Sequence, residues 1–269
     1  MKAIQPPAVD REFVERSFAR ERARAPRSIE ALSRVPLGNL TLASDVRLLA
    51  GLALSMDKVD EARRLARLGA RVMAATFELR RAEGVTIESL WPERTALVLK
   101  GPSARWDATP ADWVNAMSLA VALDDASQRV LLEHRDFASP EGVRWDRFWE
   151  PWVDLWVHAL AGHTAGAGHS LARCLELTDP KQVIVPESYV LSVCVPPLEV
   201  MYRALERTAA GFDTAIEKAL TRHNAYWGPK PEELEALVPG LLLGAVRWGD
   251  RLGVRRTVDS PLFRFLPIV

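Results

Sequence analysis

Apolar residues recur at intervals of three and four along most of this chain, the spacing that places them on one side of a helix. The pattern predicts helices over residues 10–25, 41–55 and 57–83, one that starts at 109 or 110, and further helices over 126–134, 144–161, 165–178, 188–210, 211–227 and 232–249, the last with a break left open at 239–240. Because proline cannot donate a helical hydrogen bond, we expect Pro26 to end the first helix.

Two stretches depart from this periodicity. Residues 84–105 alternate apolar and polar positions between Gly and Pro, which predicts one or two short strands or an ordered loop. The last residues, from Val254, read as an extended tail. Because no strand–helix–strand alternation occurs, the sequence predicts a mostly α fold of stacked antiparallel helix pairs in one compact array. We expect a single domain, 1–269, and leave open a division into an N-terminal helical part, 1–83, and a second part, 105–269.

Four tryptophans share one side of a predicted helix. Trp145, Trp149, Trp152 and Trp156 are spaced by four, three and four residues, and Pro151 must start, end or kink their helix. An aromatic stripe of this kind is typical of a packed core, and the alternative is an exposed partner surface.

Composition narrows the class of protein. The 269 residues are 48% hydrophobic and 26% charged, as in soluble globular proteins. The 35 basic residues balance 35 acidic ones, which gives no support to general binding of nucleic acid or anionic membranes. The longest apolar stretch, 48–56, is far shorter than the ~20 residues of a membrane span, and no secretion signal is evident. We therefore expect a cytoplasmic protein.

Histidine and glycine residues gather at 158–174 without matching a known site. Gly162–Ser170 lacks the lysine and the preceding strand of a phosphate-binding loop, so we interpret it as a turn between helices. His158, His163, His169 and Cys174 are spaced by five and six residues, which turns neighbouring side chains to different sides of a helix. We therefore predict no metal site and no cofactor.

No catalytic signature is apparent elsewhere. Asp124 and Asp125 are adjacent, so on a helix they diverge by ~100° and are better interpreted as a helix boundary than as a catalytic pair. His223 lies on an apolar stripe with Phe212 and Ile216, where a hydrogen-bonded core histidine is the usual interpretation. We predict no catalytic residue.

Three stretches share a pattern with a known family. Residues 211–227 carry a phenylalanine, alanine–leucine pairs, a histidine and a closing Tyr-Trp pair. Apolar residues 239–245, an Arg-Leu-Gly turn at 251–253 and Ser-Pro-Leu at 260–262 follow, and 112–125 combines a tryptophan, an alanine-rich run and an aspartate pair. Across roughly residues 105–265, these stretches resemble the immunity protein 49 family of bacterial polymorphic toxin systems.

The resemblance implies a mostly helical, non-enzymatic protein that binds and neutralises a cognate toxin encoded beside it. Candidate toxin-binding residues are the acidic and aromatic side chains Asp124, Asp125, Tyr226, Glu232, Glu233 and Trp248, with Glu235, Trp91 and Trp106 as further candidates. A helical adaptor or scaffold in a regulatory complex is the alternative. An enzyme that uses His163, His169 or His223 with Asp124 is a weaker one.

Overall fold

The computed structural model describes residues 3–6, 8–35, 38–89, 91–101, 109–135, 137 and 144–267. Helix accounts for 69% of the structure, far above the ~30–35% of an average globular protein, so the predicted mostly α fold is confirmed. The helices are α1 (Arg11–Ser33), α2 (Gly38–Ser55), α3 (Val59–Glu78), α4 (Pro110–Leu123), α5 (Asp125–Glu133), α6 (Trp149–Leu160), α7 (Thr164–Leu177), α8 (Glu187–Tyr189), α9 (Val195–Glu206), α10 (Ala209–Trp227), α11 (Leu234–Leu237) and α12 (Gly240–Arg251). In the described part of the chain, no helix is long and apolar enough to cross a membrane.

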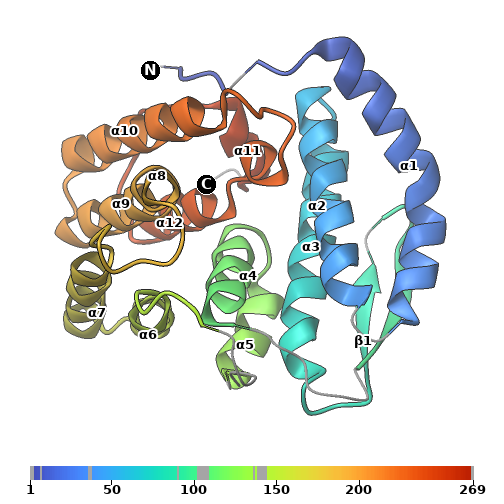
Figure 1. Ribbon diagram of the computed structural model, residues 1–269, viewed down its shortest axis with the longest axis horizontal. Helices are drawn as coiled ribbons and strands as arrows, with labels where there is room; N and C mark the ends of the chain where they lie inside the picture. The colour runs from blue at the N-terminus through green and yellow to red at the C-terminus, as the bar shows by residue number, and fades with distance from the viewer. Residues whose placement is uncertain are drawn as a thin grey trace.

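The helices pack as neighbouring pairs (Figure 1). The largest helix–helix contacts join α2 with α3, α4 with α12, and α6 with α7. In Figure 1, α1, α2 and α3 form one side of the molecule, α6 to α10 form the other, and α4 and α5 lie between them. The expected stacking of helix pairs is therefore present.

Helix α12 lies unusually close to α4. A Cβ atom placed on Gly244 would lie 2.5 Å from the backbone oxygen of Ser118. The same serine accepts a hydrogen bond of 3.2 Å at its Oγ from Trp156 Nε1, which ties α6 to this contact. The absence of a side chain at Gly244 is what allows these two helix backbones to meet.

The prediction that Pro26 ends the first helix is wrong, because α1 continues to Ser33 with Pro26 inside it. Phe18, Ala25 and Ile29 are buried at spacings of seven and four, so the apolar stripe runs on past the proline. Burial of Ile29 stabilises the part of the helix that follows the proline. It acts against the ~3 kcal/mol that a proline inside a helix typically costs.

The non-helical stretch forms a hairpin. Strands β1 (Gly84–Ser89) and β2 (Thr95–Lys100) pair antiparallel, with Val85 opposite Leu99 and Thr86 opposite Val98. The first pair is buried and the second is exposed, so the hairpin has one inner and one outer face. β1 packs against α3 and β2 against α1.

The tryptophan stripe is core along α6. Trp152 and Trp156 are fully buried, Trp149 is nearly so, and the Trp149 and Trp152 rings stack with centroids 5.2 Å apart. Trp145 precedes the helix and is half-buried. Pro151 lies in the first turn of α6, where its missing N–H costs no helical hydrogen bond.

Two predicted elements differ in part from the structure. The predicted helix 188–210 is divided, because a π-helical turn, η1 (Val190–Cys194), joins α8 to α9. The tail is not extended throughout, because Pro261–Phe265 form a 3₁₀ helix, η2, which buries Leu262 and Phe265 against the core. Both cysteines, Cys174 in α7 and Cys194 in η1, are free thiols and fully buried.

Candidate functional site

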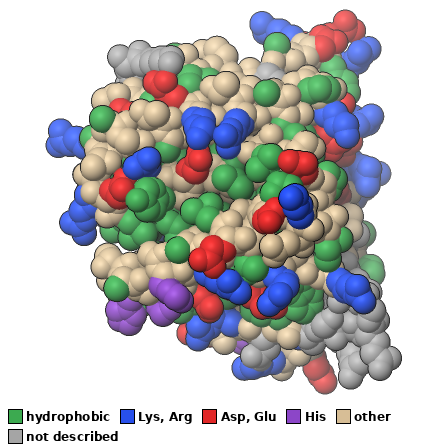
Figure 2. Space-filling model, turned by 60° about the vertical axis from the view of Figure 1, so that its left-hand side comes forward, with side chains coloured by type: hydrophobic (Ala, Val, Ile, Leu, Met, Phe, Trp, Pro, Cys, Tyr) green, Lys and Arg blue, Asp and Glu red, His purple; other side chains and the backbone are tan. Residues whose placement is uncertain are grey.

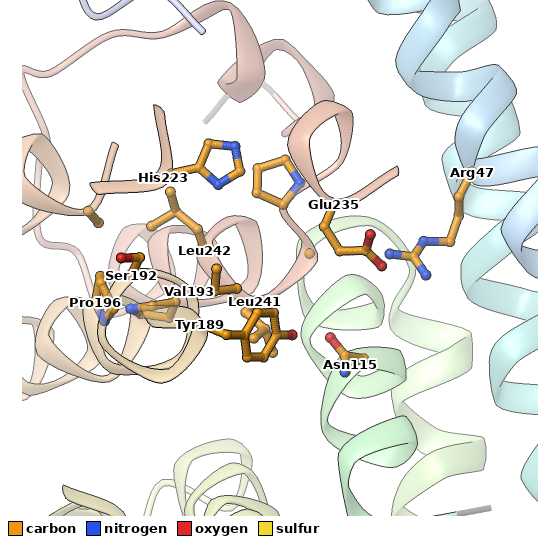
Figure 3. Close-up of a pocket in the computed structure, with 14 residues that line it drawn as sticks. Arg47, Asn115, Tyr189, Ser192, Val193, Pro196, His223, Glu235, Leu241 and Leu242 are labelled. Carbon is orange, nitrogen blue, oxygen red and sulfur yellow. The ribbon is translucent and has the colours of Figure 1, made fainter. Parts of the chain in front are cut away.

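A polar pocket lies where the two sides of the molecule meet. Six elements contribute polar side chains to its lining: Arg47 from α2, Asn115 from α4, Tyr189 from α8, Ser192 from η1, His223 from α10 and Glu235 from α11. Figure 3 shows the Glu235 carboxylate and the Arg47 guanidinium pointing toward each other. The pocket therefore joins residues that are up to 188 positions apart in the chain (235 − 47).

Arg47 is buried although it carries a charge. It is 8% exposed, its Nη1 lies 3.8 Å from Met73 Sδ, and its Nε has no hydrogen-bond partner among the described residues. Burial lowers the pKa of the guanidinium, and the charge of nearby Glu235 acts in the opposite direction. The signal in the sequence was a lone arginine inside the apolar segment 41–55, but the sequence did not say what it would face.

His223 confirms the prediction of a hydrogen-bonded core histidine. The side chain is 4% exposed, and Nε2 lies 3.2 Å from the carbonyl oxygen of Ala236. Burial lowers its pKa to about 4, although the bond to Ala236 acts the other way. The ring is therefore neutral at pH 7, with the proton on Nε2 for donation to the carbonyl.

The pocket is small for a substrate. Its cavity volume is about 30 Å³, room for one or two water molecules. Sites for small molecules typically measure ~300–1,000 Å³. The pocket thus suits solvation of a buried polar cluster.

The predicted toxin-binding residues fall into separate places. Tyr226 lies beside the pocket, because its ring centroid is 6.0 Å from that of Tyr189. Glu232 and Glu233 are exposed in the connection from α10 to α11, just before Glu235. Tyr226 and the two glutamates therefore lie at the C-terminal end of α10 and in the connection that follows it.

Asp124 and Asp125 lie at the junction of α4 and α5, away from the connection between α10 and α11 (Figure 1). Asp124 is buried, caps α5 by accepting from Ser127 N at 3.1 Å, and pairs with Arg71 Nη2 at 3.2 Å. Asp125 is exposed and pairs with Arg251 of α12 at 2.6 Å. The interpretation as a helix boundary is confirmed, and Asp124 has little surface to offer a partner.

The tryptophan candidates are also internal. Trp248 is buried in α12, where its ring meets that of Trp156 edge-on at 6.4 Å. Trp91 is buried and donates from Nε1 to Glu61 Oε1 at 3.0 Å. Trp106 lies outside the described residues. Trp248 and Trp91 therefore stabilise the core.

The predicted turn at Gly162–Ser170 is shorter than expected, because α6 ends at Leu160 and α7 already begins at Thr164. Gly162 has φ of 74°, which favours glycine at this turn. Figure 2 shows histidine side chains together at one edge of the face that it draws. The ring centroids of His158 and His163 lie 6.2 Å apart. No group of three or more His, Cys, Asp or Glu within the described ranges is placed to hold a metal ion.

Comparison with known proteins identifies the family. No curated protein and no solved structure matches the chain. The model of the family described as Immunity protein 49 matches residues 55–263, which runs from the end of α2 through the hairpin and into η2. This match covers most of the chain and begins well before the stretches that carry the resemblance in the sequence. The chain therefore belongs to the Immunity protein 49 family.

Proposed function

We propose that this protein binds a cognate bacterial toxin, encoded beside it, and neutralises it in the cytoplasm by forming a stable complex. The family match over residues 55–263 carries the proposal. An immunity protein must hold its toxin stoichiometrically, because each free toxin molecule acts many times. Nanomolar affinity corresponds to about −12 kcal/mol, which an interface of standard size can supply.

The polar pocket is better explained as part of the core than as a catalytic site. The polar pocket has room for water and little else, and His223 is held neutral by burial against the Ala236 carbonyl. The helices pack through a continuous core, which gives a rigid frame for a preformed interface. On the face in Figure 2, hydrophobic side chains lie among charged side chains of both signs, as in many interfaces that form and dissociate.

The exposed acidic and aromatic candidates are a proposed contact for a basic toxin. Glu232, Glu233 and Asp125 are exposed, and Tyr226 is partly exposed. Acidic side chains at an interface rim would mainly speed association with a cationic partner and make it depend on salt. Charge reversal at Glu232 and Glu233 should then slow association without unfolding the protein.

Co-expression tests the function. The neighbouring toxin gene is expressed in a heterologous bacterium with and without this protein, and survival and co-purification are measured. We expect death without the protein, survival with it, and a stable complex from the surviving cells. Survival without any complex would contradict the proposal and would point to an enzyme acting on the toxin's product or target.

A further inference from the structure

The outer edge of β2 carries unpaired backbone groups. Gly101 N donates to Glu83 O at 2.9 Å, which continues the β1–β2 ladder by one pair and fixes which residues alternate inward and outward. In an antiparallel pair, residues of every second pair point their N–H and C=O groups away from the partner strand. By this alternation, the backbone N–H and C=O groups of Ala96 and Val98 in β2 point away from β1. Their cross-strand partners are Glu88 and Thr86 of β1.

Two side-chain contacts support this assignment of direction. Arg71 Nη1 donates to the carbonyl of Glu88 at 3.0 Å, and Asn39 Nδ2 donates to that of Lys100 at 3.3 Å. By the same alternation, both carbonyl groups point away from the partner strand. Within the described residues, no hydrogen bond reaches the outward N–H and C=O groups of Ala96 and Val98.

A groove runs along this edge, between β2 and the second half of α1. Its lining takes residues 95–98 and Lys100 from β2, but only Ser89 from β1, so the groove follows the strand's edge and neither face of the hairpin. Its cavity volume is about 560 Å³, within the range of ligand-binding sites. Figure 1 shows the hairpin between α3 and α1.

The lining suits a polypeptide whose backbone is recognised. Ile29 provides an apolar floor, and Val98 is 55% exposed. The charged lining residues cancel, because Glu30 and Glu93 are matched by Arg34 and Lys100, and Glu30 already pairs with Arg34 at 2.8 Å. Recognition here therefore depends on hydrogen bonds from the strand edge, with little selection by charge.

A second copy of the chain does not fit this groove. Each copy's β2 edge is flanked by its own α1, so bringing two edges together would drive the two helices into each other. The occupant must be a single extended segment with no helix along its pairing edge.

We infer that an extended segment of the toxin adds to β2 as a third strand, in the groove between β2 and α1. The inference rests on the proposed function and names the contact through which it operates. Up to four hydrogen bonds would form, two each with Ala96 and Val98. Addition of a strand to an exposed sheet edge is a recurring mode of peptide recognition.

Proline substitution separates the two edges of the hairpin. Val98→Pro removes an outward N–H from β2, and Thr86→Pro removes the outward N–H of its cross-strand partner on β1. Proline is tolerated on sheet edges where the N–H faces away from the ladder, so both variants keep the hairpin's internal bonds. Val98→Thr keeps the N–H and the branched side chain and serves as a second control.

The probe is the toxin expressed from the neighbouring gene, inactivated for purification, with affinity measured by calorimetry. We expect Val98→Pro to weaken binding at least tenfold, and Thr86→Pro and Val98→Thr to stay within about twofold of the wild type. Equal affinity of Val98→Pro and the wild type would overturn the inference and leave the proposed function standing. No binding by the wild type would instead refute the proposed function.

A measurement on the wild type tests the added strand even if the proline variants do not fold. Amide hydrogen exchange at Ala96 and Val98 should be fast in the free protein and slow by at least tenfold in the complex. Unchanged exchange at both amides in the complex would contradict the added strand. Protection that grows with the protein's own concentration, without toxin, would show a second copy in the groove and also overturn the inference.

Discussion

The close contact of α4 and α12 yields a prediction whose sign is not obvious from sequence. In Gly244→Ala, the new Cβ would meet three backbone atoms of Ser118, at 2.5 Å from O, 2.8 Å from Cα and 2.9 Å from C. Real Cβ atoms essentially never approach non-bonded heavy atoms of other residues within 3.0 Å. Because backbone atoms cannot rotate away as a side chain can, the two helices would have to separate.

The expected magnitude is a difference of two effects. Alanine in a helix interior is favoured over glycine by ~1 kcal/mol. Overpacking a core costs about 1–3 kcal/mol, and a collision with backbone belongs at the upper end. Gly244→Ala should therefore lower the free energy of unfolding by about 2 kcal/mol, or the melting temperature by roughly 4–8 °C.

Gly168 in α7 is the matched control. A Cβ there would meet nothing within 4 Å, so Gly168→Ala should raise the free energy of unfolding by about 0.5–1 kcal/mol. Urea unfolding followed by circular dichroism measures both variants. If Gly244→Ala is as stable as the wild type, or if both variants shift in the same direction, the argument from close helix contact is refuted.

Three further predictions concern buried side chains. Trp152→Ala should cost about 3–5 kcal/mol in urea unfolding, because the indole is fully buried, whereas unchanged unfolding with lost toxin binding would make the stripe an interface. Asp124→Ala, which removes the α5 cap and a partner of Arg71, should cost about 1–3 kcal/mol, and Asp124→Asn should cost less in the same assay because it keeps a capping oxygen. The lowered pKa of His223, about 4, means that the unfolded chain binds the proton more tightly, so stability should fall by about 2 kcal/mol from pH 7 to pH 5. His223→Gln should lose about that much less over the same interval, and an equal loss in both would contradict the assignment.

Local patterns in the sequence predicted much of the fold. The tryptophan spacing predicted the buried side of α6. The helix expected to start at residue 109 or 110 is α4, which begins at Pro110 and is capped by Thr109 and Asp112 reciprocally. Such features depend on residues within a turn or two of one another. Their physics is contained in a short stretch of sequence, so they are accessible without a structure.

Features that depend on distant contacts were not accessible. Local rules predict that Pro26 ends a helix, but α1 continues beyond it, with Ile29 buried against the core. Arg47 stands in an apolar segment of the sequence, whereas Glu235 and Tyr189 reach it only through the folded arrangement of α2, α8 and α11. Alternation in residues 84–105 suggested strands, but which strand edge stays open depends on the placement of α1 and α3.

The two buried thiols can report local unfolding of the elements in which they lie. Burial raises the pKa of Cys174 and of Cys194, and the thiolate is the form that reacts with alkylating reagents. Alkylation therefore requires local opening of α7 or η1. The alkylation rate at each cysteine measures how often that element opens. Neither thiol lies in the hairpin or in α1. A toxin segment held at β2 would therefore slow alkylation only if binding at one side of the molecule also restrains the helices of the other.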